Sequence, residues 1–166
     1  MLVFPVLWSE RLKLRQLTVD DFPQLTQLAN NKKISDWIIN MPFPYGEFNA
    51  VHRMSHVVNG FNNKSHFVFT IATKADDLLI GEISINIREC ESAEIGYWLG
   101  EPYWGQGYMS ESIAKIVDFG FERLNLTSIY ATVDKNNPNS IHVLVKQGFK
   151  QIKDKGKVKV YAKFKE

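Results

Sequence analysis

The sequence predicts a single α+β domain with a mixed, mostly antiparallel central sheet flanked by helices. Three observations support this class. The chain has 166 residues, enough for one hydrophobic core. Three β-rich runs follow one another between residues 67 and 99 with only short turns between them. After residue 108, two helix-like segments alternate with strand-like ones. No repeat or linker interrupts residues 1–166, so we expect one domain over that range.

The first half of the chain supplies one strand and two helices. Residues 11–17 alternate polar and apolar and predict a strand. Thr18 is a suitable cap for a helix over residues 20–30, which has acidic residues in its first turn. Residues 35–48 contain Pro and Gly and predict a loop, although Trp37, Phe43 and Tyr45 make it unusually apolar. A weaker helix is expected over residues 47–59.

The second half supplies most of the sheet. We expect consecutive antiparallel strands over residues 67–72, 79–87 and 93–99. An apolar stripe predicts a helix over residues 110–124, and a strand follows at 128–133. The segment 137–147 begins with cap-type residues and ends at Gly148, which indicates a second helix. Two short strands around Asp154 and Gly156 complete the chain as a hairpin.

Composition narrows the class of protein. The formal net charge is only +2, so we expect no direct binding to nucleic acid. The single cysteine, Cys90, excludes an intrachain disulfide framework and favours a reducing compartment. The N-terminus is a poor signal peptide, and no apolar run approaches the length of a membrane span. We therefore expect a cytoplasmic protein that does not insert into a membrane, either a monomer or a homodimer.

The stretch EPYWGQGYMSE, residues 101–111, joins a strand to a helix and contains two glycines. Gly105 and Gly107 remove side chains that would keep a phosphate away from the backbone, and the free amides of the following helix favour an anion. A nucleotide-triphosphate loop needs a lysine after its second glycine, and Tyr108 stands there instead. The antiparallel strands before it disfavour a dinucleotide fold. The alternatives are a plain turn and a diphosphate site held mainly by backbone donors.

Three segments together carry a resemblance to a known family. They are SERLKLRQL near the start, AEIGYWLGEPYWGQGYMSES in the middle and NNPNSIHVLVKQGF near the end. In this order the chain resembles the GNAT superfamily of acyl-CoA-dependent N-acyltransferases, and within it the RimJ/RimL-type enzymes that acetylate the N-terminal amines of ribosomal proteins. The resemblance implies an N-acetyltransferase that uses acetyl-CoA as cosubstrate. No His, Cys or carboxylate cluster in the sequence has the spacing of metal ligands, so we expect no metal.

The resemblance also implies how acetyl-CoA would be bound. The pyrophosphate would lie against the loop, and the pantetheine arm would lie beside the preceding strand where it splays from its neighbour. Gly107 matches the family pattern of the loop, whereas Trp104 and Met109 depart from it, and the side chain of Met109 would have to point away from the phosphates. The implied cofactor-binding residues are Trp98, Leu99, Trp104, Gly105, Gln106, Gly107, Tyr108, Met109, Ser110 and Asn137.

Asn137 and Ser140 have two readings. Taken alone, they are typical of a helix cap. The resemblance places them where the family contacts pantetheine and the CoA sulfur. Many members carry a tyrosine general acid farther along this helix, and Leu144 occupies that position here. Ser140 is then the best candidate to protonate the departing thiolate.

The alternation of side chains along the predicted strands suggests two candidates for the catalytic base. Glu94 shares a strand face with Gly96 and Trp98, and Glu82 lies on a polar face of the preceding strand. This face would meet either solvent or a substrate cleft. We expect Glu94 to be the catalytic base, with Glu82 second and bordering the substrate.

The acceptor is expected to be a primary amine that approaches beside Trp37, Phe43 and Tyr45, unless these side chains are simply buried. Residues 35–60 contain only two acidic residues, Asp36 and Glu47, which favours a protein N-terminal α-amine, such as that of a ribosomal protein, over a polycation. The alternatives are a small amine, such as a polyamine or an aminoglycoside, and a noncatalytic acyl-CoA-binding module.

Overall fold

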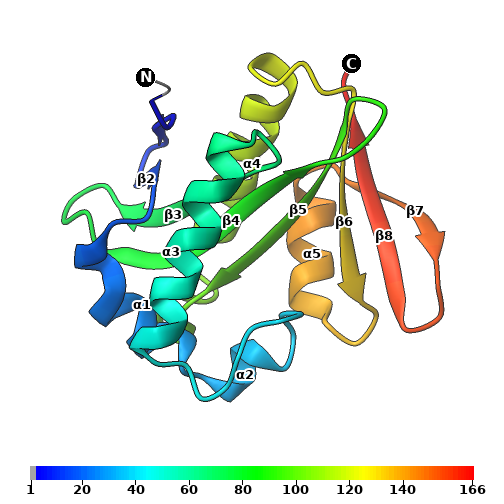
Figure 1. Cartoon of the computed structure of the whole chain (residues 1–166). Coiled ribbons are helices and arrows are strands. Elements are labelled where there is room, and N and C mark those ends of the chain that lie inside the picture. The colour runs from blue at the N-terminus through cyan, green and yellow to red at the C-terminus, as the bar shows by residue number, and fades with distance from the viewer. Residues whose placement is uncertain (1–2) are drawn as a thin grey trace.

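The fold is built on one twisted sheet. The computed structural model describes residues 3–166, and within this range the sheet has eight strands in the order β1-β2-β3-β4-β5-β6-β8-β7 (Figure 1). Neighbouring strands are antiparallel except β5 and β6, which are parallel. The strands are β1 (Leu7–Trp8), β2 (Leu12–Arg15), β3 (His66–Thr73), β4 (Leu79–Ile87), β5 (Ser92–Leu99), β6 (Ser128–Asp134), β7 (Lys150–Asp154) and β8 (Val158–Phe164).

Helices cover both faces of the sheet and divide the core into two clusters. On one face, α1 (Phe22–Ala29), α2 (Lys32–Ser35) and α3 (Glu47–Asn62) contribute to a cluster that includes Val68 and Trp98. On the other, α4 (Tyr108–Glu122) and α5 (Pro138–Lys146) contribute to a larger cluster that includes Phe69 and Ile83. Short 3-10 turns, η1 (Val19–Asp21) and η2 (Glu101–Tyr103), precede α1 and the loop before α4.

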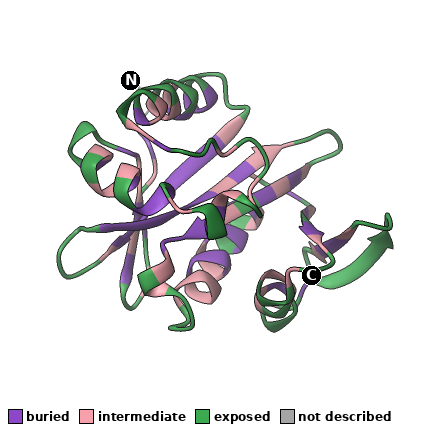
Figure 2. Cartoon of the chain, turned by 90° about the horizontal axis from the view of Figure 1, so that it is seen from below, coloured by how far each residue is buried: buried purple, intermediate pink, exposed green. Residues whose placement is uncertain are grey.

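Strand alternation explains this division. Phe67, Phe69 and Ile71 of β3 point into the larger cluster, whereas Val68 points to the face of α1 and α3. Buried residues accordingly gather along the strands and the inward helix faces (Figure 2). The edge strand β7 differs, because all of its residues are exposed. A register irregularity between Gln151 and Lys153 interrupts its pairing with β8, a feature that discourages edge-to-edge association.

The α+β class and the mostly antiparallel sheet predicted from the sequence are confirmed. Two elements were not predicted. The two-residue strand β1 is too short to show a period and exists through its pairing with β2. The helix α2 begins just before the predicted loop, where the side chain of Asn31 accepts a hydrogen bond from the amide of Lys33. The predicted helix over residues 20–30 begins as η1 and becomes α-helical at Phe22.

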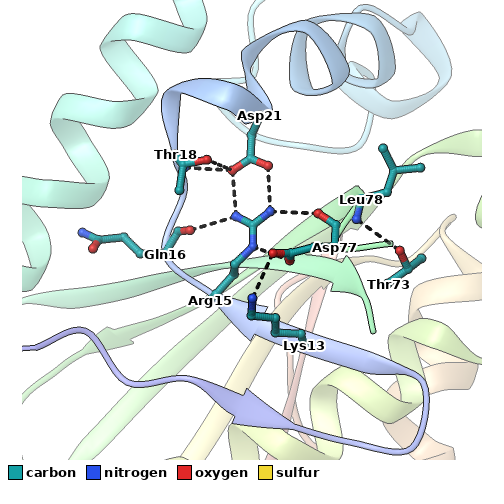
Figure 3. A network of polar contacts seen from close by, with 8 residues as sticks. All are labelled: Lys13, Arg15, Gln16, Thr18, Asp21, Thr73, Asp77 and Leu78. Carbon is teal, nitrogen blue, oxygen red and sulfur yellow. Dashed lines mark hydrogen bonds and ion pairs between the residues drawn. The ribbon is translucent and has the colours of Figure 1, made fainter. Parts of the chain in front are cut away.

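A polar network fastens β2 to the turn between β3 and β4 and to the start of α1 (Figure 3). The Arg15 guanidinium donates to both carboxylate oxygens of Asp21, at 2.7 and 2.8 Å, and to Asp77 at 2.7 Å. Asp21 also accepts from the amide of Thr18 at 2.8 Å. Burial alone would raise the pKa of Asp21, but the hydrogen bonds from Arg15 and Thr18 outweigh it and hold the pKa below the usual carboxyl value.

We expect Asp21→Asn to lower the free energy of unfolding by about 1–3 kcal/mol at pH 7, because a buried charge-assisted pair is lost. The folded-state pKa of Asp21 is depressed, so its contribution is present above the unfolded-state pKa and disappears as the pH falls through the lower folded-state value. Urea unfolding of both proteins between pH 7 and pH ~3 should therefore show their difference shrinking toward acid pH.

Asp36→Asn is the matched control, since Asp36 forms an exposed i,i+4 pair with Lys32; it should change stability by less than about 0.5 kcal/mol. A stability gap for Asp21→Asn that stays constant with pH would show that the Asp21 charge contributes nothing.

Candidate active site

The strands β5 and β6 separate soon after they begin. Their parallel register pairs Ser92 with Ser128 and ends at Glu94 opposite Tyr130. Beyond that point β5 stays paired with β4 as far as Leu99, and β6 stays paired with β8 as far as Asp134. Figure 1 shows the two strands diverging, with α5 beside the gap. The sheet is therefore open between the second half of β5 and its neighbour.

Backbone groups of β5 face this opening. The amide of Gly100 donates to the carbonyl of Ile80 at 2.8 Å, on the β4 side. Because hydrogen-bonding direction alternates along a strand, the backbone groups of Tyr97 and Leu99 point to the opposite side, toward β6. Of the two residues predicted to lie along a pantetheine arm, Leu99 presents its backbone to the opening, whereas the backbone of Trp98 faces β4.

The loop at the end of β5 has the conformation that its glycines allow. Gly105 and Gly107 have φ values of +72° and +82°, in the left-handed region that favours glycine. Gly107 is the N-cap of α4, and its carbonyl accepts from the amide of Glu111 at 3.1 Å. The amides of Tyr108, Met109 and Ser110 begin the helix and have no intrahelical carbonyl partner. They form a concentration of donors next to exposed glycines.

The two departures from the family pattern have structural explanations. The indole of Trp104 donates to the carbonyl of Leu99 at 2.8 Å and so ties the loop to the strand. The half-buried Met109 packs against the larger hydrophobic cluster. Its side chain is thus directed to the core, as the sequence analysis required if the backbone is to remain accessible.

The structure adds a cation that the loop sequence lacks. Arg11, before β2, donates through Nη1 to the carbonyl of Gln106 at 3.0 Å and through Nε to Glu111 of α4 at 2.8 Å. Its guanidinium carbon lies 4.4 Å from the ring centroid of Tyr108. Ser9 donates to the same Glu111 carboxylate. Sequence reasoning assigned no role to Arg11, because about a hundred residues separate it from its partners.

At the start of α5, Asn137 caps the helix and the Ser140 hydroxyl has a hydrogen-bond partner. Asn137 is the N-cap, and its side-chain oxygen accepts from the amide of Ser140 at 3.1 Å. The hydroxyl of Ser140 lies 2.8 Å from the phenol oxygen of Tyr97 on β5. Leu144 is fully buried in the larger cluster. The hydroxyl groups of Ser140 and Tyr97 therefore meet beside the opening, and Tyr97 was not predicted.

On the other face of the sheet, Glu82 is a buried ion-pair partner. It is only 3% exposed, and both of its oxygens accept from Arg53 of α3, at 3.1 and 3.2 Å. The Trp98 indole donates to it at 3.0 Å. Burial together with the charge of Glu82 raises the pKa of the nearby Tyr45 to about 12. Glu82, Tyr45 and Trp98, predicted from separate segments, thus gather in one buried group with Arg53.

Glu94 lies where β5 and β6 begin to part. One oxygen pairs with Arg88 at 2.9 Å, and the other accepts from Thr132 of β6 at 3.0 Å. Gly96 on the same face is exposed and presents no side chain. Glu94 is therefore partly exposed at the mouth of the opening, but it is already hydrogen-bonded.

The predicted aromatic residues of segment 35–48 do not share one environment. Trp37 and Phe43 are about half exposed, and Tyr45 is buried. Phe48, at the start of α3, is 73% exposed, so apolar surface continues onto that helix. Residues 3–166 hold no group of three or more acidic, His or Cys side chains suited to a metal ion. No helix in that range has the length and apolar character to cross a membrane.

Sequence comparisons place this arrangement in a known family. A family model described as an acetyltransferase (GNAT) domain matches residues 11–150. The uncharacterized N-acetyltransferase p20 of Bacillus licheniformis is 32% identical over 148 residues, covering 87% of this chain and 82% of that protein. A spermidine N(1)-acetyltransferase of Vibrio cholerae is 28% identical over 141 residues, covering 85% and 80%. A ribosomal-protein-serine acetyltransferase of Escherichia coli is 36% identical over 76 residues, covering 45% and 42%.

Solved structures agree on the fold. RimJ of Mycobacterium smegmatis, in complex with CoA-disulfide, superposes with a TM-score of 0.83 at 20% identity and covers 97% of this chain and 86% of that one. With the family model spanning most of the sequence, the resemblance found in the three motifs is confirmed. The chain belongs to the GNAT family of acetyltransferases and is an N-acyltransferase.

Proposed function

We propose that this enzyme transfers the acetyl group of acetyl-CoA to the α-amine of a protein N-terminus. The observation that carries the proposal is the opening between β5 and β6, which begins where their pairing ends at Glu94 and Tyr130. The loop at 104–107 and the first amides of α4 lie at the far end of β5 and suit a diphosphate. The backbone groups of Tyr97 and Leu99 that no neighbouring strand pairs, apart from the Leu99 carbonyl that Trp104 occupies, suit the amide groups of a pantetheine arm.

Each residue around the opening would have a separate role in the reaction. The amine would attack the thioester carbonyl, whose oxygen would accept a hydrogen bond from a β5 backbone amide. Glu94 would take the amine proton, directly or through a water, and the Ser140 hydroxyl would donate a hydrogen bond to the leaving sulfur. Arg88 and Thr132 each donate to one oxygen of Glu94. These hydrogen bonds orient the carboxylate, and the amine proton would have to use a lone pair that they leave free. Glu82 is the second candidate base, although Arg53 already neutralises it.

A modest base is sufficient for an α-amine. Its pKa is near 8, so about a tenth is neutral at pH 7, a cost of roughly 1.4 kcal/mol. A lysine amine near 10.4 would cost about 4.6 kcal/mol. A carboxylate whose oxygens are already hydrogen-bonded therefore fits an α-amine better than it fits a lysine.

Charge near the opening also supports this acceptor. A polyamine needs unpaired carboxylates, and Glu82 is matched by Arg53 whereas Glu94 is matched by Arg88. The exposed surface of Trp37, Phe43 and Phe48 suits apolar side chains of a peptide. A ribosomal protein N-terminus, reached in the cytoplasm by a monomeric or homodimeric enzyme, satisfies these requirements.

The second candidate acceptor is a polyamine. It is favoured by the Vibrio cholerae spermidine N(1)-acetyltransferase, which aligns over 85% of this chain. A noncatalytic acyl-CoA-binding module is the remaining alternative, and Leu144 in the usual tyrosine position is the residue that supports it.

Acceptor class can be decided directly. With acetyl-CoA present, we expect peptides bearing free α-amines to release CoA thiol at least tenfold faster, by kcat/KM, than spermidine or an aminoglycoside, because the lower α-amine pKa leaves more of it neutral. Thiol release followed by mass spectrometry of the product measures this. N-terminally blocked peptides containing lysine are the control. Faster turnover of spermidine would replace the peptide acceptor, and CoA binding without turnover of any amine would favour the binding module.

The loop can be tested by CoA binding alone. Gly107→Ala places a side chain on a left-handed backbone, a strain of about 1–2 kcal/mol, beside the first α4 amides. We expect calorimetry to show CoA affinity lowered about tenfold. Gly156→Ala is the matched control, since its φ of +81° imposes similar strain in the β7–β8 hairpin, away from the loop. Equal CoA affinity in the two variants would remove the loop from the site.

The base can be tested by pH dependence. We expect Glu94→Gln to lower kcat/KM at least tenfold, since an amide cannot accept the amine proton, and to leave in its pH profile only the acid limb that the protonated amine substrate itself causes. Glu91→Gln, on the exposed turn before β5, is the control. If Glu94→Gln keeps the wild-type rate and profile, Glu82→Gln becomes the variant to examine.

A further inference from the structure

The contact between Tyr97 and Ser140 joins the two sides of the opening. Tyr97 lies on β5, past the point where pairing with β6 has ended, and Ser140 lies on α5, which follows β6. Their oxygens are 2.8 Å apart, and Tyr97 also approaches the carbonyl of Ser140 at 3.5 Å. A side-chain hydrogen bond thus links α5 directly to the part of β5 that no longer pairs with β6.

The chemistry of the two groups sets the direction of the hydrogen bond. A phenol is a stronger acid, and so a better hydrogen-bond donor, than an aliphatic alcohol. Burial raises the pKa of Tyr97 to about 12, so it keeps its hydrogen across the working pH range. When the phenol donates to Ser140 Oγ, the single hydrogen of Ser140 is free for another acceptor. Donation onto an oxygen also strengthens the hydrogen bond that this oxygen's own hydrogen makes.

We propose that Tyr97 is a positioning residue that aims the Ser140 hydroxyl at the leaving sulfur. The inference rests on the proposed acetyl transfer. The observation behind it is the Tyr97–Ser140 hydrogen bond, combined with the full burial of Leu144, which has no hydroxyl.

The reaction step balances without ionising Tyr97. The amine nitrogen forms the new N–C bond as the C–S bond breaks, and the bonding pair stays on sulfur. The sulfur accepts the hydrogen bond of Ser140, which is itself supported by Tyr97. The thiolate takes a proton from solvent as CoA leaves, and this proton balances the one that the amine gave up to Glu94 or water.

The pKa of the bound CoA thiol tests the pair without any turnover. A hydrogen bond to the sulfur stabilises the thiolate, so CoA bound to the wild type should titrate below free CoA when followed by ultraviolet thiolate absorbance. We expect Tyr97→Phe to raise the bound thiol pKa by about half to one unit, the equivalent of one ordinary hydrogen bond. Ser140→Ala should raise it by at least as much. Tyr161→Phe, which removes a weakly bonded hydroxyl at 3.4 Å from Gln151, is the control and should change nothing.

A double-mutant cycle on kcat tests the coupling. With the best amine found, we expect Tyr97→Phe to lower kcat about three- to tenfold with KM for acetyl-CoA unchanged, and to cause less than a twofold further loss in the Ser140→Ala background. Full additivity of the two substitutions, or an unchanged thiol pKa in Tyr97→Phe, would overturn the inference. If no amine is turned over, the proposed function fails, whereas the thiol titration still decides the role of Tyr97.

Discussion

The early end of the β5–β6 pairing is the constraint on which the rest of the site depends. Parallel pairing that continued past Glu94 and Tyr130 would consume the backbone groups of Tyr97 and Leu99 and close the sheet. Instead, β5 stays paired with β4 and β6 stays paired with β8, so both strands keep one hydrogen-bonded neighbour where they separate. Helix α5 lies beside the gap between the two strands (Figure 1).

The loop after β5 gains its shape from contacts outside it. Two left-handed glycines allow the turn, but Trp104 fixes it to Leu99 and Arg11 fixes it to Glu111. Arg11, itself paired with Glu111, thereby places a guanidinium beside the backbone donors of a loop that has no cationic residue of its own. The strand that follows Arg11 is β2, and its far end is held by Arg15, which pairs with Asp21 and Asp77 (Figure 3). A segment at the edge of the fold thus supports the proposed cofactor site.

The two faces of the sheet carry different chemistry. On the α4 and α5 side, the hydroxyl groups of Tyr97 and Ser140 meet beside the part of β5 that does not pair with β6. On the α1 and α3 side, Glu82 is buried against Arg53, and Glu94 is paired with Arg88. Thioester and amine would therefore meet from opposite faces, and the two carboxylates nearest the opening, Glu82 and Glu94, are each paired with an arginine.

The sequence by itself determined the fold class, most of the elements and the loop, since hydrophobic period, cap residues and glycine spacing are local properties. Its three motifs also identified the family, which the comparisons confirmed. Only the tertiary structure decided that Met109 turns into the core, that Glu82 is neutralised by Arg53, that Arg11 contacts the loop and that Tyr97 contacts Ser140. The physical reason is that these contacts join residues about 30 to 100 positions apart, and no local pattern records which side chains a folded sheet brings within hydrogen-bonding distance.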